Sequence, residues 1–534
     1  MSWVLLIATF LPLVAGAILA IAPLERSACR VAALLVTATT FVLVTILCFA
    51  FDPAQGAVPQ FTVDMPWLPG VSSVRLALGL DGISLWLMPL TALLCIVAVL
   101  SSWVSIEEGA RGFYSLILVL ETGLLGVFAA LDVVLFYIFF EFTLIPLFFI
   151  IGIWGGEERR RAAIKFFIYT LAGSVLTLIG LVYTVVAYYQ QHGTWTFSIP
   201  ELVTNTRIPV EHQMLVFLAL FAGFAIKVPV FPFHTWLPLA HVEAPTAGSV
   251  LLAGVLLKLG TYGFVRFSLP LTPVAAQHAF PWIATLAVAG VVYGALCAMA
   301  QRDIKRLVAY SSISHMGFCV LGLFALNEQG IAGGILQMVN HGLATGAMFA
   351  IVGMLYDRYH TRMIEDYGGT ASVLPKLIVL AMIIIFAGIG LPGLNGFVSE
   401  ILILLGAFKT HKLSAALAAT GIVLGAYYML TLAQRVFFGE RRTPEAEDLR
   451  WYEAAALVPV AAVCLWIGLY PNTFLKPMLP AIQQTLRTMH SEVSAEVSQT
   501  RSRAGRVLTV GDSVRSIGSV FEGDGSQVAR TSTW

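Results

Sequence analysis

The sequence has few charged residues for its length. Of 534 residues, 11% are charged and 58% are hydrophobic, whereas soluble globular proteins carry about 25% charged residues. The formal net charge is only +1, so no excess of positive charge favours binding to nucleic acid. These shortages exclude a soluble multidomain enzyme, a disordered chain and a collagen-like chain. The remaining class is a polytopic membrane protein.

Motifs for cofactors and metals are also lacking. The six cysteines lie far apart and form no Cys-x-x-Cys pair, so an iron–sulfur cluster, a zinc ribbon and a disulfide framework all lack support. The chain has neither a Walker-type phosphate loop nor a dinucleotide fingerprint. We therefore expect no cofactor and no metal in this chain. The first 23 residues lack the basic start of a signal peptide and predict an uncleaved first span.

Long apolar runs are the main feature that is present. A helix needs about 20 apolar residues to cross the hydrocarbon of a bilayer. By this measure the sequence predicts an all-α polytopic membrane protein with about fourteen transmembrane helices. The predicted spans lie near residues 3–22, 32–51, 84–105, 113–131, 133–153, 163–189, 213–235, 245–267, 280–300, 306–325, 331–356, 376–406, 413–438 and 453–471.

Lys and Arg are distributed unevenly between the predicted loops. One set of alternate loops holds seventeen of them and the opposite set holds five. Cytoplasmic loops of membrane proteins accumulate these residues, so both termini are expected on the outer side of a bacterial inner (cytoplasmic) membrane. Seven more follow residue 475, which leaves only Lys227 and Lys258 inside the membrane.

Two predicted spans contain helix-breaking residues. Pro229 and Pro232 interrupt one span, and Pro392 lies in a Gly-rich segment of another. Proline removes a backbone donor, and unwound backbone at membrane depth survives only where it lines a cavity or is packed in protein. The breaks occupy similar places in two blocks of five spans. Because five is odd, the blocks have opposite topology, which indicates inverted repeats with an ion site near the midplane; two unrelated proline kinks are the alternative.

This pattern predicts five regions along the chain. They are three N-terminal helices in 1–112, a first five-helix repeat in 113–268, a second, inverted repeat in 280–438, a last helix in 453–471 and a polar, mobile tail in 476–534.

Four ionisable residues stand alone in apolar stretches of the predicted spans. They are the carboxylates Glu141 and Glu400 and the amines Lys227 and Lys258. A charge at the bilayer centre costs at least a few kcal/mol, so each is a functional candidate. The alternatives are a neutral, hydrogen-bonded Glu and a Lys side chain that reaches the interface.

Several histidines lie close to these charges in the sequence. His315 and His341 are mid-span, and imidazole suits a proton relay between Lys258 and the second carboxylate; packing is the alternative. His234 and His241 flank the first break, and His234 is a further relay candidate. Both could bind zinc, but no third ligand shows at metal spacing, so a relay or structural role is favoured. A string of acid, bases, imidazoles and acid across both blocks suits proton transfer.

The same residues lie in motifs that resemble a known family. Between about residues 1 and 475 the chain resembles the antiporter-like membrane subunits of respiratory complex I, most closely the M-type, which is subunit 4 of the mitochondrial complex. The matching motifs are residues 139–147 (FFEFTLIPL), 153–156 (IWGG), 225–238 (AIKVPVFPFHTWLP), 244–250 (APTAGSV), 303–317 (DIKRLVAYSSISHMG) and 391–400 (LPGLNGFVSE).

The resemblance implies a non-redox, proton-translocating subunit of an NADH:quinone oxidoreductase. In the family, the Glu at position 141 pairs with the Lys at position 227, the Lys at position 258 is the central proton carrier, and the acid at position 400 serves the exit half-channel. Glu400 favours the M-type, because the two sister antiporter-like subunits have Lys there. The resemblance places NADH, flavin, iron–sulfur clusters and quinone in partner subunits, with the sister subunits and the lipid bilayer as neighbours.

Two departures from the family pattern stand out. Leu239 occupies a place where the family commonly has Asp, and the tail after about residue 490 is longer than is usual for the M-type. The alternative function is a subunit of a Mrp-type cation/proton antiporter or of a membrane-bound hydrogenase, which share the fold. The residues hardly separate these complexes, and they leave open whether protons or sodium ions move.

Overall fold

Long apolar helices dominate the fold. The structure, a computed structural model, describes residues 1–68, 70 and 72–494. Within these residues, eleven helical segments are long and apolar enough to cross a membrane, and α3 and α17 are shorter apolar helices. This confirms an all-α, multi-pass membrane protein, while the count of fourteen spans stays a prediction.

The N-terminal part contains helices and one small antiparallel sheet. Its elements are α1 (Ser2–Ile21), α2 (Arg26–Ala50), the short 3-10 turn η1 (Pro53–Gln55), β1 (Gln60–Pro66), β2 (Arg75–Leu80) and α3 (Leu87–Ser101). The next segment contains α4 (Ala110–Ala129), α5 (Val133–Phe142), α6 (Leu144–Trp154), α7 (Arg159–His192), α8 (Ile199–Asn205), α9 (Val210–Lys227), α10 (Leu237–Glu243), α11 (Thr246–Leu251), the π-helical turn η2 (Leu252–Leu256), α12 (Leu257–Gly263), the π-helical turn η3 (Phe264–Ser268) and α13 (Leu269–Leu271).

The remaining elements are helices and short helical turns. They are α14 (Pro273–Met299), α15 (Ile304–Leu323), α16 (Glu328–Tyr359), the 3-10 turns η4 (Ile364–Asp366) and η5 (Thr370–Ser372), α17 (Pro375–Gly388), α18 (Asn395–Thr410), α19 (Lys412–Phe437), α20 (Trp451–Leu469) and a last helical stretch at 472–494.

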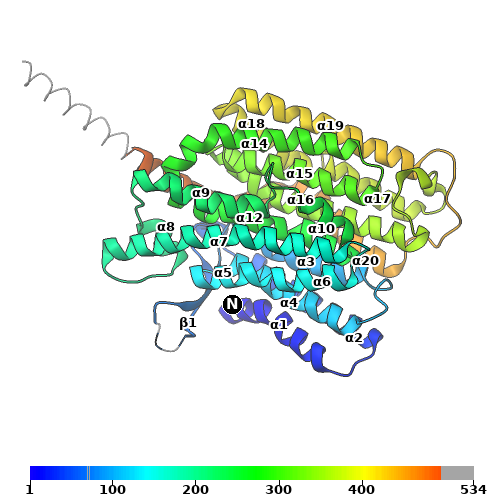
Figure 1. Ribbon diagram of the computed structural model, residues 1–534, viewed down its shortest axis with the longest axis horizontal. Helices are drawn as coiled ribbons and strands as arrows, with labels where there is room; N and C mark the ends of the chain where they lie inside the picture. The colour runs from blue at the N-terminus through cyan, green and yellow to red at the C-terminus, as the bar shows by residue number, and fades with distance from the viewer. Residues whose placement is uncertain (69, 71, 495–534) are drawn as a thin grey trace, which may run out of the picture.

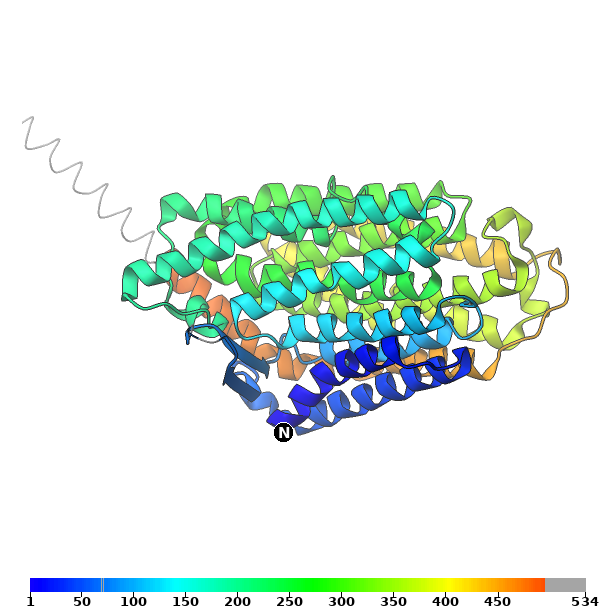
Figure 2. The same cartoon turned by 60° about the horizontal axis from the view of Figure 1, so that its bottom comes forward.

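The long helices run in roughly one direction, so their connections gather at two ends (Figure 1). The strand β1 and α8 lie at one end, and the loop between α19 and α20 lies at the other. Helices α1 and α2 form one edge (Figure 2), where 33% and 28% of their most apolar stretches are buried. The corresponding stretches of Thr246–Leu271 and α16 are completely buried, so these two segments form the centre of the bundle.

The loops rich in Lys and Arg contact one another at a common end. Side chains in these loops or at the adjoining helix ends donate hydrogen bonds to backbone carbonyls, from Arg30 to Trp103 (2.9 Å), from Trp154 to Glu108 (2.9 Å) and from Arg362 to Val242 at the end of α10 (2.9 Å). The contacts agree with the predicted grouping of alternate loops, which sets the orientation in the membrane.

Both predicted helix breaks are present. Helix α9 ends at Lys227 and α10 begins at Leu237, while α17 ends at Gly388 and α18 begins at Asn395. Gly390, in the second break, has a φ of +72°, which a residue with a side chain rarely adopts. The broken helices are thereby confirmed; the inverted relation between two five-helix blocks stays a prediction.

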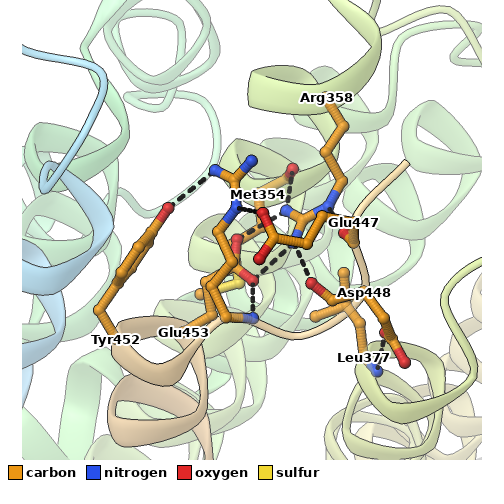
Figure 3. Close-up of polar contacts among 8 residues, drawn as sticks. Met354, Arg358, Leu377, Glu447, Asp448, Tyr452 and Glu453 are labelled. Carbon is orange, nitrogen blue, oxygen red and sulfur yellow. Dashed lines mark hydrogen bonds and ion pairs between the residues drawn. The ribbon is translucent and has the colours of Figure 1, made fainter.

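A buried ion pair joins α16 to α20 (Figure 3). Arg358 of α16 donates to both carboxylate oxygens of Glu453 of α20, at 2.6 and 2.7 Å. Its other three hydrogen bonds reach the carbonyls of Met354, Glu447 and Asp448, so all five guanidinium N–H groups are used. We call this set of contacts the Arg358–Glu453 clasp.

The clasp also fixes the start of α17. The Asp448 carboxylate accepts hydrogen bonds from the backbone N–H groups of Lys376 and Leu377, at 3.0 and 3.2 Å. These N–H groups belong to the first turn of α17, where a carboxylate is favoured. One loop therefore holds the first part of the broken helix against α16 and α20.

The chain beyond residue 475 differs in part from the expected polar tail. Residues 472–494 are helical, and Phe474, Met478, Ile482 and Leu486 from this helix are buried. Their spacing of four residues puts them on one helix face, which explains why this stretch packs instead of remaining mobile. The rest of the predicted tail, 495–534, lies outside the described residues.

Candidate functional site

The centre of the site is Lys258, in the first turn of α12. Its side chain is completely buried, and its ammonium nitrogen donates to the carbonyl of Ala253 in η2. The same nitrogen lies 2.7 Å from Nδ1 of His341. An ammonium group and a doubly protonated imidazole are both donors only. Lys258 and His341 therefore make this contact only when one of them provides a free lone pair.

His341 leads from Lys258 toward a second histidine. The ring of His341, on α16, lies 5.8 Å from the ring of His315, on α15, measured between centroids. Nε2 of His341 has no hydrogen-bond partner in the part of the chain that the structure describes. His315 and His341 both line a cavity of about 10 Å³. This volume is enough for about one water molecule.

Glu400 continues this line of groups. Its Oε1 lies 3.2 Å from Nδ1 of His315, and the residue is 4% exposed. A Cβ atom placed on Gly390 would lie 2.8 Å from its Oε2, so the broken segment packs directly against the carboxylate. Nearby, the Asn340 amide donates to the Ser399 hydroxyl at 2.8 Å, which adds polar groups where α16 meets α18.

The structure thus brings together four of the seven predicted site residues. Lys258, His341, His315 and Glu400 come from four different helices, yet successive members lie in contact or share the small cavity. This order is the one expected for imidazoles that relay protons between an amine and a carboxylate.

The other predicted acid and base lie close to each other in an open arrangement. The Lys227 ammonium, at the end of α9, lies 4.2 Å from the ring centroid of Phe140, the residue before Glu141. Among the described residues, neither Lys227 Nζ nor Glu141 Oε1 has a hydrogen-bond partner, and no ion pair joins them. The Glu–Lys pair implied by the resemblance is therefore adjacent but not closed.

His234 lies apart from this chain of contacts. It stacks on Phe231 and meets Tyr293 edge-on, with centroid distances of 5.5 and 5.1 Å. It lines a cavity of about 270 Å³ together with Leu239 and Arg306. Leu239, which stands where the family commonly has Asp, therefore contributes an apolar side chain to the wall of this cavity.

His241 gives no support to the zinc alternative. Its ring stacks on Phe349 at 4.5 Å, and both ring nitrogens lack partners among the described residues. Within the same part of the chain, no group of three or more His, Cys, Asp or Glu residues is arranged to hold a metal ion.

Sequence reasoning missed one buried acid and the polar clasp. Glu121 lies in the middle of α4, which overlaps the predicted span 113–131, so the rule that selected Glu141 also applies to it. Arg358 and Glu453 lie near helix ends and are 95 residues apart. Only their contact in the folded chain identifies them as a pair.

Comparison with known proteins decides the family. Residues 130–425 match the family described as NADH:quinone oxidoreductase/Mrp antiporter, TM. The chain belongs to this family. It is 42% identical to NADH-quinone oxidoreductase subunit M of Rhodobacter capsulatus over 516 residues, which cover 92% of this chain and 98% of the relative. It is also 42% identical to NADH-ubiquinone oxidoreductase chain 4 of Chondrus crispus, over 88% of this chain and 95% of the relative.

Two solved structures share the fold of this chain. A chain of respiratory complex I from Thermus thermophilus superposes with a TM-score of 0.83 and 34% identity, covering 91% of this chain and 99% of that one. A chain of the Mrp complex from Dietzia sp. gives a TM-score of 0.78 at 19% identity, with the same coverage, which shows the shared fold alone. The resemblance to complex I membrane subunits of the M-type is confirmed, and the Mrp alternative has less support. The bacterial relatives agree with the predicted inner-membrane location.

Proposed function

We propose that this family member is a proton-translocating membrane subunit of an NADH:quinone oxidoreductase. The observation that carries the proposal is the chain of contacts from Lys258 through His341 and His315 to Glu400. Each of these groups both holds and releases protons, and imidazole does so near neutral pH. The groups lie inside a bundle of apolar helices, where an ionisable residue is expensive and marks an ion or proton pathway.

Proton transfer along this chain proceeds in three steps. Lys258 gives a proton to Nδ1 of His341, which accepts it on its free lone pair. A water molecule in the small cavity carries a proton from Nε2 of His341 to His315. His315 then passes a proton to the carboxylate of Glu400, beside the broken segment between α17 and α18. After its transfer His341 keeps a proton on Nδ1 and has its free lone pair on Nε2, so the proton must return to Nε2, by a ring flip or by exchange through water, before Nδ1 accepts the next proton from Lys258.

Glu141 and Lys227 act as an electrostatic switch for this chain. When they form an ion pair, the carboxylate neutralises the charge of Lys227. When the pair is open, the positive charge of Lys227 disfavours a second positive charge on Lys258. Helices α9 and α12 pack closely, since a Cβ on Gly260 would lie 2.6 Å from the carbonyl oxygen of Phe224. Opening of the pair therefore promotes the release of a proton from Lys258.

The redox chemistry belongs to partner subunits. We assign NADH, flavin, iron–sulfur clusters and quinone to those partners, and we place the two sister antiporter-like subunits beside this chain in the bilayer. The residues of this chain hold and move protons only. Its share in the enzymatic reaction is to couple electron transfer in the partners to proton movement across the membrane.

Co-purification of the tagged chain from its native membrane tests the assignment to a complex. Subunits that carry flavin and iron–sulfur clusters and oxidise NADH are expected in the purified material. Recovery of Mrp antiporter subunits, or of a hydrogen-oxidising module, would replace the assignment with one of the alternatives.

Two substitutions test the proton path in the same preparation. Glu141→Ala and Lys227→Ala are expected to abolish proton pumping coupled to NADH oxidation while the chain stays inserted in the complex. Lys409→Ala, at the exposed end of α18, serves as the control and is expected to pump normally. A normal proton-to-electron ratio in either test variant would contradict the proposal.

A further inference from the structure

Glu121 is a buried acid for which the proton path described above has no role. It lies near the middle of α4 and its exposed fraction is 0%. Neither of its carboxylate oxygens has a hydrogen-bond partner among the residues that the structure describes. An ionised carboxylate in such a place costs several kcal/mol, because no opposite charge or donor offsets the loss of water. Burial of Glu121 is therefore unfavourable in the ionised form, and the residue is expected to hold a proton while it stays in this position.

The helix geometry shows which way Glu121 faces. Tyr114, Glu121 and Phe128 are seven residues apart, so they lie on one face of α4. The hydroxyl of Tyr114 donates to the carbonyl of Ser102, at the end of α3 (2.9 Å). The ring of Phe128 packs edge-on against Tyr262 of α12 at 5.2 Å. Glu121 therefore lies between these two contacts, on the side of α4 that faces α3 and α12.

The opposite side of α4 contacts the elements of the first acid. Cβ atoms on Gly123 and Gly126 would lie 3.1 Å from the Thr143 side chain and 2.4 Å from the Phe139 ring, which flank Glu141. On α12, Tyr262 and Lys258 are four residues apart and share a face. Glu121 is thus turned away from Glu141 and toward α3 and α12, the second of which carries Lys258.

We propose that Glu121 is a further proton-holding carboxylic acid of the translocation reaction, which exchanges its proton with the Lys258 region through the interface between α4 and α12. In this step the O–H bond of the protonated carboxyl breaks and an N–H bond forms on a neutral Lys258 amine, with intervening water molecules passing the proton between them. The reverse transfer restores the acid. No oxidant or further reactant is involved. The proposal rests on the proposed function, because it assumes that Lys258 carries protons.

The experiment compares an amide with an acid at this position in the intact, reconstituted complex. Glu121→Gln keeps the size and polarity of the side chain but holds no exchangeable proton, whereas Glu121→Asp keeps the acid. Glu121→Gln is expected to lower the proton-to-electron ratio and to remove one carboxylic-acid C=O band from the infrared difference spectrum of turnover. Glu121→Asp is expected to retain the pumping and a shifted band. Thr122→Val, which alters the neighbouring buried residue of α4, is the matched control and is expected to leave both readouts unchanged.

Three results would overturn the role of Glu121. They are normal pumping in Glu121→Gln, an unchanged infrared spectrum in that variant, and equal losses in the acid and amide variants, which indicate a packing role. If Glu121→Gln does not assemble, Glu121→Asp against Glu121→Asn gives the same comparison at a shorter length. If only this inference fails, Lys258→Ala still shows a lowered proton-to-electron ratio, whereas a native ratio in Lys258→Ala shows that the proposed function itself is wrong.

Discussion

Lys258 and His341 share a buried contact of 2.7 Å between two nitrogen atoms that are both donors when fully protonated. The two residues are 83 positions apart and meet because α12 packs against α16 at the centre of the bundle. When they are in contact, the two side chains together hold one proton fewer than they would hold as separate, fully protonated groups. It is therefore a natural place for a proton to move from one group to the other.

Replacement of His341 interrupts the path between Lys258 and His315. We expect His341→Ala to retain NADH oxidation in the assembled complex and to lose most of the pumping that depends on this chain, because His341 contacts Lys258 and lies next to His315. His278→Ala, an exposed histidine of α14, is the control. Proton uptake by inverted membrane vesicles, recorded with a pH-sensitive dye, is the measurement. Equal uptake in the two variants would show that His341 is only a packing residue.

Gly390 is expected to be intolerant of a side chain. In Gly390→Ala the φ of +72° costs about 1–3 kcal/mol, and the added Cβ lies 2.8 Å from Glu400 Oε2. The carboxylate must therefore move away from His315, and we expect reduced pumping in a complex that still assembles. In Gly112→Ala, at an exposed position of α4, the added Cβ makes only an ordinary contact with the Trp154 ring at 3.7 Å, so this variant should behave as the native chain does. Similar pumping in both glycine variants would argue against the position assigned to Glu400.

The Arg358–Glu453 clasp should stabilise the protein measurably. Glu453→Gln leaves the buried Arg358 guanidinium without its counter-charge, and loss of one partner of a buried ion pair costs about 3–5 kcal/mol. Glu445→Gln breaks the ion pair with Arg441, in which Glu445 is exposed, and such surface pairs contribute about 0–1 kcal/mol. Thermal unfolding of the detergent-solubilised chain should show a large decrease in Tm only for the first variant. An equal Tm for both would mean that the clasp adds little.

Much of the architecture was predictable because local sequence determines it. Apolar runs near 20 residues predict the helices. Pro229, Pro232 and Pro392 mark the two breaks, because proline removes a helix hydrogen bond and each of these prolines stands close to a further proline or to glycines. The ionisable members of the proton path were also predictable. A Lys or Glu in an apolar run is expensive wherever the run ends up in the fold.

The contacts between those residues were not predictable from local patterns. Lys258 meets His341, and His315 meets Glu400, across 83 and 85 residues of sequence. Such pairs depend on how the helices pack, and rotation of α16 by the angle of one residue would already separate His341 from Lys258. The open state of Glu141 and Lys227 likewise depends on the side-chain positions in the folded chain.

Two omissions have a different cause, because the sequence did carry a signal. Glu121 meets the same criterion as Glu141, an acid inside an apolar run. Phe474, Met478, Ile482 and Leu486 repeat every four residues, which is the pattern of an amphipathic helix in a segment that is polar on average. Composition alone concealed the helix at 472–494.

The proton-to-electron ratio of Lys258→Met in the reconstituted complex tests the proton path most directly. Methionine is similar in length to lysine and packs in apolar surroundings but holds no proton, and Lys258 is the group from which the path to His341 begins. We predict that this variant assembles, oxidises NADH and pumps fewer protons per electron than the native complex. A native ratio in an assembled Lys258→Met complex would contradict the assignment of Lys258 as the central proton carrier.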